Sequence, residues 1–115
     1  MENKCLFCGI VNREISADII GESELSLAFK DISPVAPKHI LIIPKKHLAS
    51  VSDIEIRDID IINDIFILIN KLIADDVIFE NGYRIIINNG NYGGQTVYHL
   101  HIHLMSGRKM NWPPG

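Results

Sequence analysis

The sequence predicts an α+β domain with a largely antiparallel sheet. An amphipathic helix over residues 53–74 is preceded by two β-rich segments and followed by two more, with short turns between them. Strands joined by short turns pair antiparallel, and a helix with one apolar face covers one side of such a sheet. With 115 residues, 47% of them hydrophobic, the chain can build one core, and we expect a single domain over residues 1–115.

The long helix is predicted by its apolar periodicity. Apolar side chains recur at helical spacing at Ile54, Ile61, Ile62, Ile65, Leu68, Ile69, Leu72 and Ile73. Ser52 followed by Glu55 has the capping-box pattern and predicts the start of the helix. Phe66 and Ile67 widen the apolar stripe. The wide stripe predicts either a dimer contact or a broad core face in a monomer.

The remaining elements follow from β-rich runs and turn residues. The predicted strands cover residues 25–29, 39–43, 83–87 and 97–105. Pro34 and Pro37 predict a loop between the first two strands, and a polar glycine-rich loop over residues 88–94 separates the last two. Leu6 and Ile10 have helical spacing within a short helix predicted over residues 5–13.

Charge and hydropathy exclude two classes of partner. The net charge of −3 argues against a nucleic-acid-binding surface, which is normally basic. The longest apolar run within the chain, residues 65–69, is too short to span a membrane, and the first six residues lack the apolar stretch of a signal peptide. We therefore expect a cytoplasmic protein with no nucleic-acid or membrane partner. In that setting the Cys5-x-x-Cys8 pair predicts a metal site or two thiols rather than a structural disulfide.

Three histidines alternate with apolar residues near the C-terminus. In the predicted strand, His99, His101 and His103 share one face, while the intervening Leu100, Ile102 and Leu104 face the core. One metal bound by all three would be strained, because the outer two Cα atoms lie about 13 Å apart in a strand. The alternative is an extended row in which one imidazole attacks phosphorus and its neighbour holds a phosphate oxygen. The geometry favours this second hypothesis.

A glycine-rich segment directly precedes the histidine row. The backbone of Gly93-Gly94-Gln95-Thr96 can approach a ligand closely and offer N–H groups to phosphate. The Thr96 hydroxyl either contacts phosphate or the leaving group, or caps a turn.

Residues 93–105 resemble the motif of the histidine triad family, in which three histidines alternate with apolar residues. Residues 29–39, 43–47 and 112–115 are similar to further signatures of that family, the last to its Hint branch of nucleoside phosphoramidases. The resemblance implies a five-stranded antiparallel sheet with one long and one short helix. It also implies a homodimer with a continuous sheet.

The resemblance also implies a role for individual residues. His101 would form a covalent nucleotidyl intermediate, His103 would hold the α-phosphate, and His39 and His99 would orient or tune the site. Asp31 would bind the ribose hydroxyls, and Trp112 would reach towards the partner subunit's site. The implied wall around the base consists of Leu6, Phe7, Ile10, Phe29 and Ile32, and the implied phosphate contacts are Asn88, Gly94, Gln95 and Thr96. The branch usually has serine at the position of Thr96.

Some members of the family and its relatives bind structural zinc, and the matching positions here are Cys5, Cys8, His47 and His99. This is the composition of a closed structural site; the alternative is two thiols and a surface histidine. No metal is required for the implied catalysis. The sequence predicts a purine nucleoside phosphoramidase that acts on a purine nucleoside monophosphate joined to an amine. The alternatives are a dinucleoside polyphosphate hydrolase and a nucleotide-binding regulatory module with little turnover.

Overall fold

The computed structural model, which describes residues 5–115, contains a five-stranded antiparallel sheet with the strand order β1-β2-β3-β5-β4. The strands are β1 (Ile19–Glu22), β2 (Ser26–Lys30), β3 (Lys38–Pro44), β4 (Arg84–Ile86) and β5 (Ile102–Ser106). The helices are α1 (Leu6–Val11) and α2 (Ile59–Ala74), with short 3-10 turns at Val51–Asp53, Ile56–Asp58 and Val77–Phe79. The predicted fold class is confirmed. Most of the N-terminal segment considered for a signal peptide lies outside the described residues.

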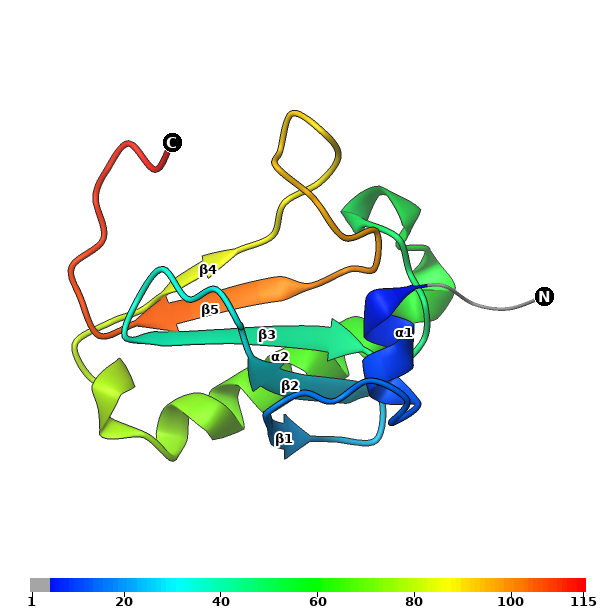
Figure 1. Ribbon diagram of the computed structural model, residues 1–115, viewed down its shortest axis with the longest axis horizontal. Coiled ribbons are helices and arrows are strands. Elements are labelled where there is room, and N and C mark those ends of the chain that lie inside the picture. Colours follow the sequence, from blue (N-terminus) through cyan, green and yellow to red (C-terminus); the bar gives the residue numbers. More distant parts are fainter. Residues whose placement is uncertain (1–4) are drawn as a thin grey trace.

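The central strand β3 separates two apolar clusters. Ile40 and Ile42 face α2, whereas Leu41 and Ile43 pack on the other face of the sheet with residues of α1 and β2. Side chains alternate along a strand, so the unbroken apolar run of β3 is buried on both faces. In Figure 1, α2 crosses the sheet, and α1 lies beside the end of β3.

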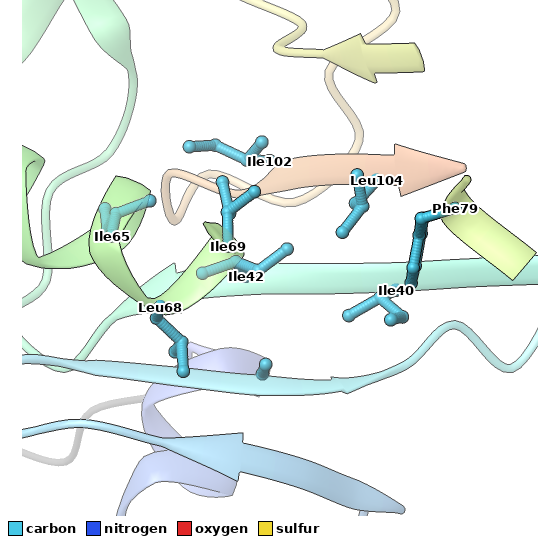
Figure 2. Packing of buried hydrophobic residues seen from close by; sticks show 9 residues of the cluster. Ile40, Ile42, Ile65, Leu68, Ile69, Phe79, Ile102 and Leu104 are labelled. Atoms are coloured by element: carbon cyan, nitrogen blue, oxygen red, sulfur yellow. The ribbon is translucent and has the colours of Figure 1, made fainter. Parts of the chain in front are cut away.

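The cluster under α2 anchors the sheet. Ile65, Leu68 and Ile69 of α2 meet apolar side chains of β3 and β5, and all of these residues are buried (Figure 2). Burying a side chain of this size stabilises the fold by roughly 1.5–3 kcal/mol. The face of the sheet that α2 leaves uncovered carries the candidate site.

The long helix begins later than the sequence predicts. Residues 51–58 form two 3-10 turns, and α2 starts at Ile59 rather than near residue 53. Ser52 and Glu55 do not form the expected capping box; a capping box is formed instead by Glu55 and Asp58. The buried Asp58 accepts from the Glu55 N–H at 2.9 Å and pairs with Lys46 at 2.9 Å. These contacts hold the turn and delay the helix.

The last strand is shorter than predicted and begins five residues later. Residues 97–101 are irregular, and β5 starts at Ile102, which pairs with Ile42. The Leu100 N–H donates to the carbonyl of Leu48 at 2.6 Å, a residue beyond the end of β3. His99 and His101 therefore do not share a regular strand with His103, and the prediction of one strand over residues 97–105 is wrong.

The structure differs from the sequence prediction in several smaller points, mainly the lengths of the short elements. Strand β1 was not apparent from alternation, because it is a short, half-buried segment that contains Gly21. The predicted strand over residues 83–87 shortens to three residues, and the predicted helix over residues 5–13 to six. Phe66 and Ile67 are exposed, so the broad-core interpretation of the α2 stripe is wrong for these two side chains. No helix among the described residues is long and apolar enough to cross a membrane.

Candidate active site and metal cluster

A cleft of about 630 Å³ opens on the face of the sheet opposite α2. Its walls come from α1, the end of β2 with the following loop, and the start of β5. The expected site residues that line it are Leu6, Phe7, Ile10, Phe29, Asp31, Ile32, His39, Asn88, Thr96, His101 and His103. The structure therefore brings together most of the residues expected around a nucleotide, from segments far apart in the sequence.

The hydrogen bond of His101 determines which ring nitrogen can react. Its Nδ1 lies 2.8 Å from the backbone carbonyl oxygen of His99. A carbonyl only accepts, so Nδ1 of the ring carries the proton and donates it. In the neutral ring, Nε2 then holds a free lone pair, which is the nucleophilic form of imidazole. The ring is buried and meets the edge of Phe7, with 5.2 Å between the ring centroids.

His39 and His103 form a second chain of hydrogen bonds. The Val35 N–H donates to His39 Nδ1 at 3.2 Å, so in neutral His39 the proton is on Nε2. That Nε2 lies 2.9 Å from His103 Nδ1 and donates to it. His103 therefore carries its own proton on Nε2. The ring lines the cleft, with its centroid 5.1 Å from that of His101, so its Nε2–H can serve as a donor to a ligand oxygen.

The pKa values of these rings support the neutral forms. Burial, together with the neighbouring His101 and His39, lowers the pKa of His103 from 6.5 to about 4. Burial also lowers the pKa of His39, and the Asp31 carboxylate partly opposes that shift. Near neutral pH both rings are uncharged, as the hydrogen-bond chain requires.

Asp31 lies next to the hydrogen bond between His39 and His103 and lines the cleft. One carboxylate oxygen accepts from the Ser33 N–H at 2.8 Å, and the other lies 3.3 Å from His39 Nε2. The neighbouring Ile32 is almost fully exposed, at 95%, and forms part of the rim rather than a closed wall. The half-buried carboxylate can accept from ligand hydroxyl groups at the open side of the cleft.

Three expected site residues lie outside the lining of the cleft. The Gln95 side chain is buried in its own loop, where it donates to the Ala49 carbonyl at 2.7 Å. The N–H groups of Gly94 and Gln95 donate to carbonyls of the same loop, those of Asn91 and Gly90. Direct phosphate contacts by Gly94 and Gln95 stay a prediction, and in the structure the N–H groups of both residues donate within the loop. The third residue, His99, is fully buried beside the cysteines.

Sequence reasoning missed several apolar lining residues. Leu41, Val97 and Met105 all contribute to the cleft. Alternation along β3 could have found Leu41, since its neighbours Ile40 and Ile42 face the helix. Val97 and Met105 have the same parity as the three histidines, so alternation along the predicted strand could have found them too.

A group of possible metal ligands lies beside α1, the helix that forms one wall of the cleft. It consists of Cys5, Cys8, His47 and His99. Their ligand atoms all lie within 4.8 Å of one another. Cys8 Sγ is 3.2 Å from His47 Nδ1, and His99 Nδ1 is 3.4 Å from Cys5 Sγ. Zinc bonds of about 2.0–2.3 Å place tetrahedral ligand atoms roughly 3.3–3.8 Å apart. The spacing and chemistry of this Cys₂His₂ set therefore fit a zinc ion.

The ring of His99 is oriented for such a role. Its Nε2 donates to the Pro44 carbonyl at 2.8 Å, which leaves the Nδ1 lone pair directed at the cysteines and His47. Donation from the second ring nitrogen to a backbone carbonyl is the usual arrangement in metal-binding histidines. Burial lowers the pKa of His99, which keeps the ring in the neutral form that binds metal.

Asp31, His39 and His103 also bring ligand atoms within 4.8 Å of one another. Their hydrogen bonds disfavour a metal, however. Because His39 Nδ1 accepts from the Val35 N–H, its Nε2 keeps a proton and has no lone pair for a metal. This group holds protons rather than a cation.

The antiparallel sheet carries a cleft lined by imidazoles and a carboxylate, and the comparisons below assign this arrangement to a family of hydrolase-type, nucleotide-binding proteins. The family model of the HIT domain matches residues 12–110, and the chain belongs to this histidine triad family. A "14 kDa zinc-binding protein" of Zea mays is 44% identical to this chain over 116 residues, which cover 99% of the chain and 90% of the maize protein.

Solved structures support the same assignment. A HIT family hydrolase from Legionella pneumophila is 47% identical, with a TM-score of 0.93 over 97% of this chain and 100% of that chain. A histidine triad nucleotide-binding protein from Candida albicans is 34% identical, with a TM-score of 0.82 over 96% of this chain and 83% of that chain.

Proposed function

We propose that this chain hydrolyses purine nucleoside 5'-phosphoramidates through a covalent intermediate on His101. The observation that carries the proposal is the Nδ1 hydrogen bond of His101, which leaves Nε2 free beside the Nε2–H of His103. A free imidazole nitrogen next to a fixed donor is what an attack on a phosphorus with developing oxygen charge requires.

The proposed reaction is two displacements at one phosphorus. In the first, His101 Nε2 bonds to the α-phosphorus, the P–N bond breaks, and the amine nitrogen takes one proton from solvent at the open mouth of the cleft. In the second, a water oxygen bonds to phosphorus, the bond to His101 breaks, and the water releases one proton. His103 donates to a phosphoryl oxygen in both steps, and no metal cofactor takes part.

We assign the remaining cleft residues to binding. Asp31 accepts from the ribose hydroxyls, Asn88 and Thr96 lie beside the phosphate, and His39 fixes the proton of His103. The wall around the base consists of Leu6, Phe7, Ile10 and Phe29, with Ile32 at its rim. The nucleotide-binding relative from Candida albicans supports a nucleotide as the ligand.

Substrate comparison with one variant tests the activity. Purified protein and His101→Ala are given an adenosine phosphoramidate and a diadenosine polyphosphate. We expect AMP release from the phosphoramidate, lowered in the variant by roughly 10⁴-fold or more, with AMP affinity retained. Preference for the dinucleotide would assign the alternative hydrolase. AMP binding without turnover of either compound would leave a nucleotide-binding module and contradict the role of His101.

We also propose that Cys5, Cys8, His47 and His99 bind structural zinc. The spacing of the ligand atoms supports this, as does the likeness to the zinc-binding protein of maize. The solvent-exposed His47 leaves a path by which the ion can enter. Elemental analysis of protein prepared without chelators is the direct measurement; absence of metal would contradict the proposal.

We propose further that the chain acts as a homodimer. The exposed side chains of Phe66 and Ile67 on α2 and the open edge of β4 are surfaces that a second copy can cover. Trp112, which is 82% exposed, would then reach the partner subunit's site. Light scattering should give twice the monomer mass for the wild type and the monomer mass for Phe66→Glu; a monomeric wild type would contradict this.

A further inference from the structure

We propose that the Cys₂His₂ cluster positions the nucleophile, with His99 as the residue shared between the metal and His101. Occupancy of the cluster would then set the orientation of the His101 ring. This inference rests on the proposed role of His101 and adds a regulatory link to it.

His101 lies outside the hydrogen-bonded ladder of the sheet. The ladder between β3 and β5 begins at the pair Ile42 and Ile102, so the nucleophile precedes the first residue that the sheet fixes. Residues 97–101 have no regular secondary structure. The position of His101 therefore depends on contacts outside the ladder.

Three hydrogen bonds supply those contacts. Leu100 N–H donates to the Leu48 carbonyl at 2.6 Å, and His99 Nε2 donates to the Pro44 carbonyl at 2.8 Å. His101 Nδ1 in turn donates to the His99 carbonyl at 2.8 Å. The first two bonds tie the irregular segment to residues 44–48, and that stretch contains the cluster residue His47.

A metal ion bound by His47 and His99 would join the two segments next to the Leu48–Leu100 hydrogen bond. The Nδ1 atoms of these histidines are already 3.2 Å apart. The two metal bonds would fix the rotation of the His99 ring and, through its short side chain, the direction of its backbone carbonyl. That carbonyl is the acceptor for the nucleophile's proton.

The helix α1 provides a second connection. Cys5 and Cys8 enclose Phe7, whose ring lies 6.0 Å from the ring of His99 and 5.2 Å from that of His101, centroid to centroid. A metal held by both cysteines would fix the first turn of this six-residue helix and therefore the aromatic edge against the nucleophile. Two independent contacts of His101 thus lead back to the same cluster.

Loss of the metal should affect catalysis more than binding. Among the binding residues, Phe29 lies within the β2–β3 ladder and Asp31 directly follows it, so these two do not depend on the cluster, whereas the part of the base wall on α1 does. Misplacement of a reacting group by about 1 Å costs roughly 100-fold in rate. We expect kcat to fall roughly 10- to 100-fold and KM to change several-fold less.

The test measures the nucleophile directly, without turnover. Nitrogen NMR of histidine-labelled protein reports which ring nitrogen of His101 carries the proton. We expect one Nδ1–H form in zinc-loaded wild type, and a mixture of both forms in Cys5→Ser and in His99→Gln. The glutamine amide can still donate to the Pro44 carbonyl, but it has no imidazole nitrogen with a lone pair for zinc.

A stability-matched control separates positioning from folding. Ile69→Ala, on the α2 side of the sheet, should destabilise the protein by roughly 2–5 kcal/mol while leaving the His101 signal and kcat of the folded protein unchanged. A single Nδ1–H form in folded, metal-free Cys5→Ser and His99→Gln would overturn the proposal.

If the substituted proteins do not fold, exchange of zinc for cadmium in the wild type tests the same link. The larger ion lengthens the metal bonds, so the His101 nitrogen signals should shift more than those of His103; equal or absent shifts would overturn the link. These readouts need no substrate, so absent phosphoramidase turnover with a metal-dependent His101 signal would contradict only the proposed function.

Discussion

Two groups of potential metal ligands border the cleft, and their hydrogen bonds give them opposite chemistry. In the Cys₂His₂ cluster, His99 donates from Nε2 to a carbonyl and turns a free lone pair towards the sulfur atoms. In the other group, His39 accepts an N–H at Nδ1 and keeps its proton on Nε2. The ligand atoms within each group lie within 4.8 Å of one another.

The comparison teaches that proximity of ligand residues does not define a metal site. In each ring, the backbone group bonded to one nitrogen decides the state of the other. A carbonyl at His99 Nε2 leaves a lone pair on Nδ1, whereas an N–H at His39 Nδ1 leaves the proton on Nε2. We therefore call the first group the candidate metal cluster and the second, defined by Asp31, His39 and His103, the hydrogen-bond relay. The following predictions test this distinction.

The largest expected effect is the loss of metal from the cluster but not from the relay. Cys5→Ser should lower the zinc content from one ion per chain to none, whereas His39→Asn should retain it. Because serine can still accept the helix-capping hydrogen bond of Cys5, the stability change reports the metal. We expect a loss of about 4 kcal/mol in the free energy of unfolding, measured by denaturant titration with excess zinc.

Two zinc ions per wild-type chain, with one lost in His39→Asn, would contradict the assignment of the relay.

The relay should make stability fall in mild acid. The pKa of His103 is about 4 in the folded protein and near 6.5 when unfolded, so the unfolded state takes up the proton first as the pH falls. The contribution is fully present above pH 6.5 and is lost between pH 6.5 and 4. It amounts to about 3 kcal/mol.

The comparison with His103→Asn isolates this contribution, because the variant keeps an amide at the position of Nδ1 and retains the metal cluster. The wild type should lose about 3 kcal/mol more than the variant between pH 6.5 and 4, by denaturant titration. Parallel pH profiles would contradict the assignment.

The relay carboxylate should affect the ligand but not the metal. Asp31→Asn should weaken AMP binding roughly 10- to 100-fold, because hydrogen bonds to a charged group contribute about 1.5–3 kcal/mol. Calorimetry with AMP and with its 2',3'-dideoxy analogue gives the matched comparison. The wild type should prefer AMP, and the variant should bind both alike; an unchanged preference would show that Asp31 does not meet the ribose.

The smallest expected effect is at Thr96. This exposed side chain lines the cleft, and Thr96→Ser keeps the hydroxyl and removes only a methyl group. We expect kcat and KM for the phosphoramidate to change by less than about fivefold. Thr96→Val, which removes the hydroxyl, should have the larger effect; equal effects of the two variants would rule out a hydroxyl contact.

Much of the fold was accessible from the sequence. The alternation in residues 99–104 predicted that Ile102 and Leu104 face the core, and both are buried in the cluster under α2. Short-range patterns failed at the element boundaries. The start of α2 depends on Lys46 meeting Asp58, and the start of β5 depends on Leu100 bonding to Leu48. Both contacts join residues that no local pattern connects.

The candidate site divides in the same way. Most of the residues that the resemblance assigns to the ligand line the cleft, but it offered no means of seeing that the Gln95 side chain bonds to Gly90 and Ala49 instead. Strand alternation also placed His99 in one row with His101 and His103. The structure instead places the ring of His99 with the cysteines, since the chain is irregular before Ile102.

By itself, the sequence determined the residue types, the apolar pattern of the sheet and the membership of the chain in the histidine triad family. Only the tertiary structure decided the proton positions on which we base the proposed nucleophile, donor and metal ligand among the histidines. The physical reason is that the partners of the imidazoles include backbone groups distant in sequence, such as the Pro44 carbonyl for His99. Folding alone brings those groups within hydrogen-bond distance.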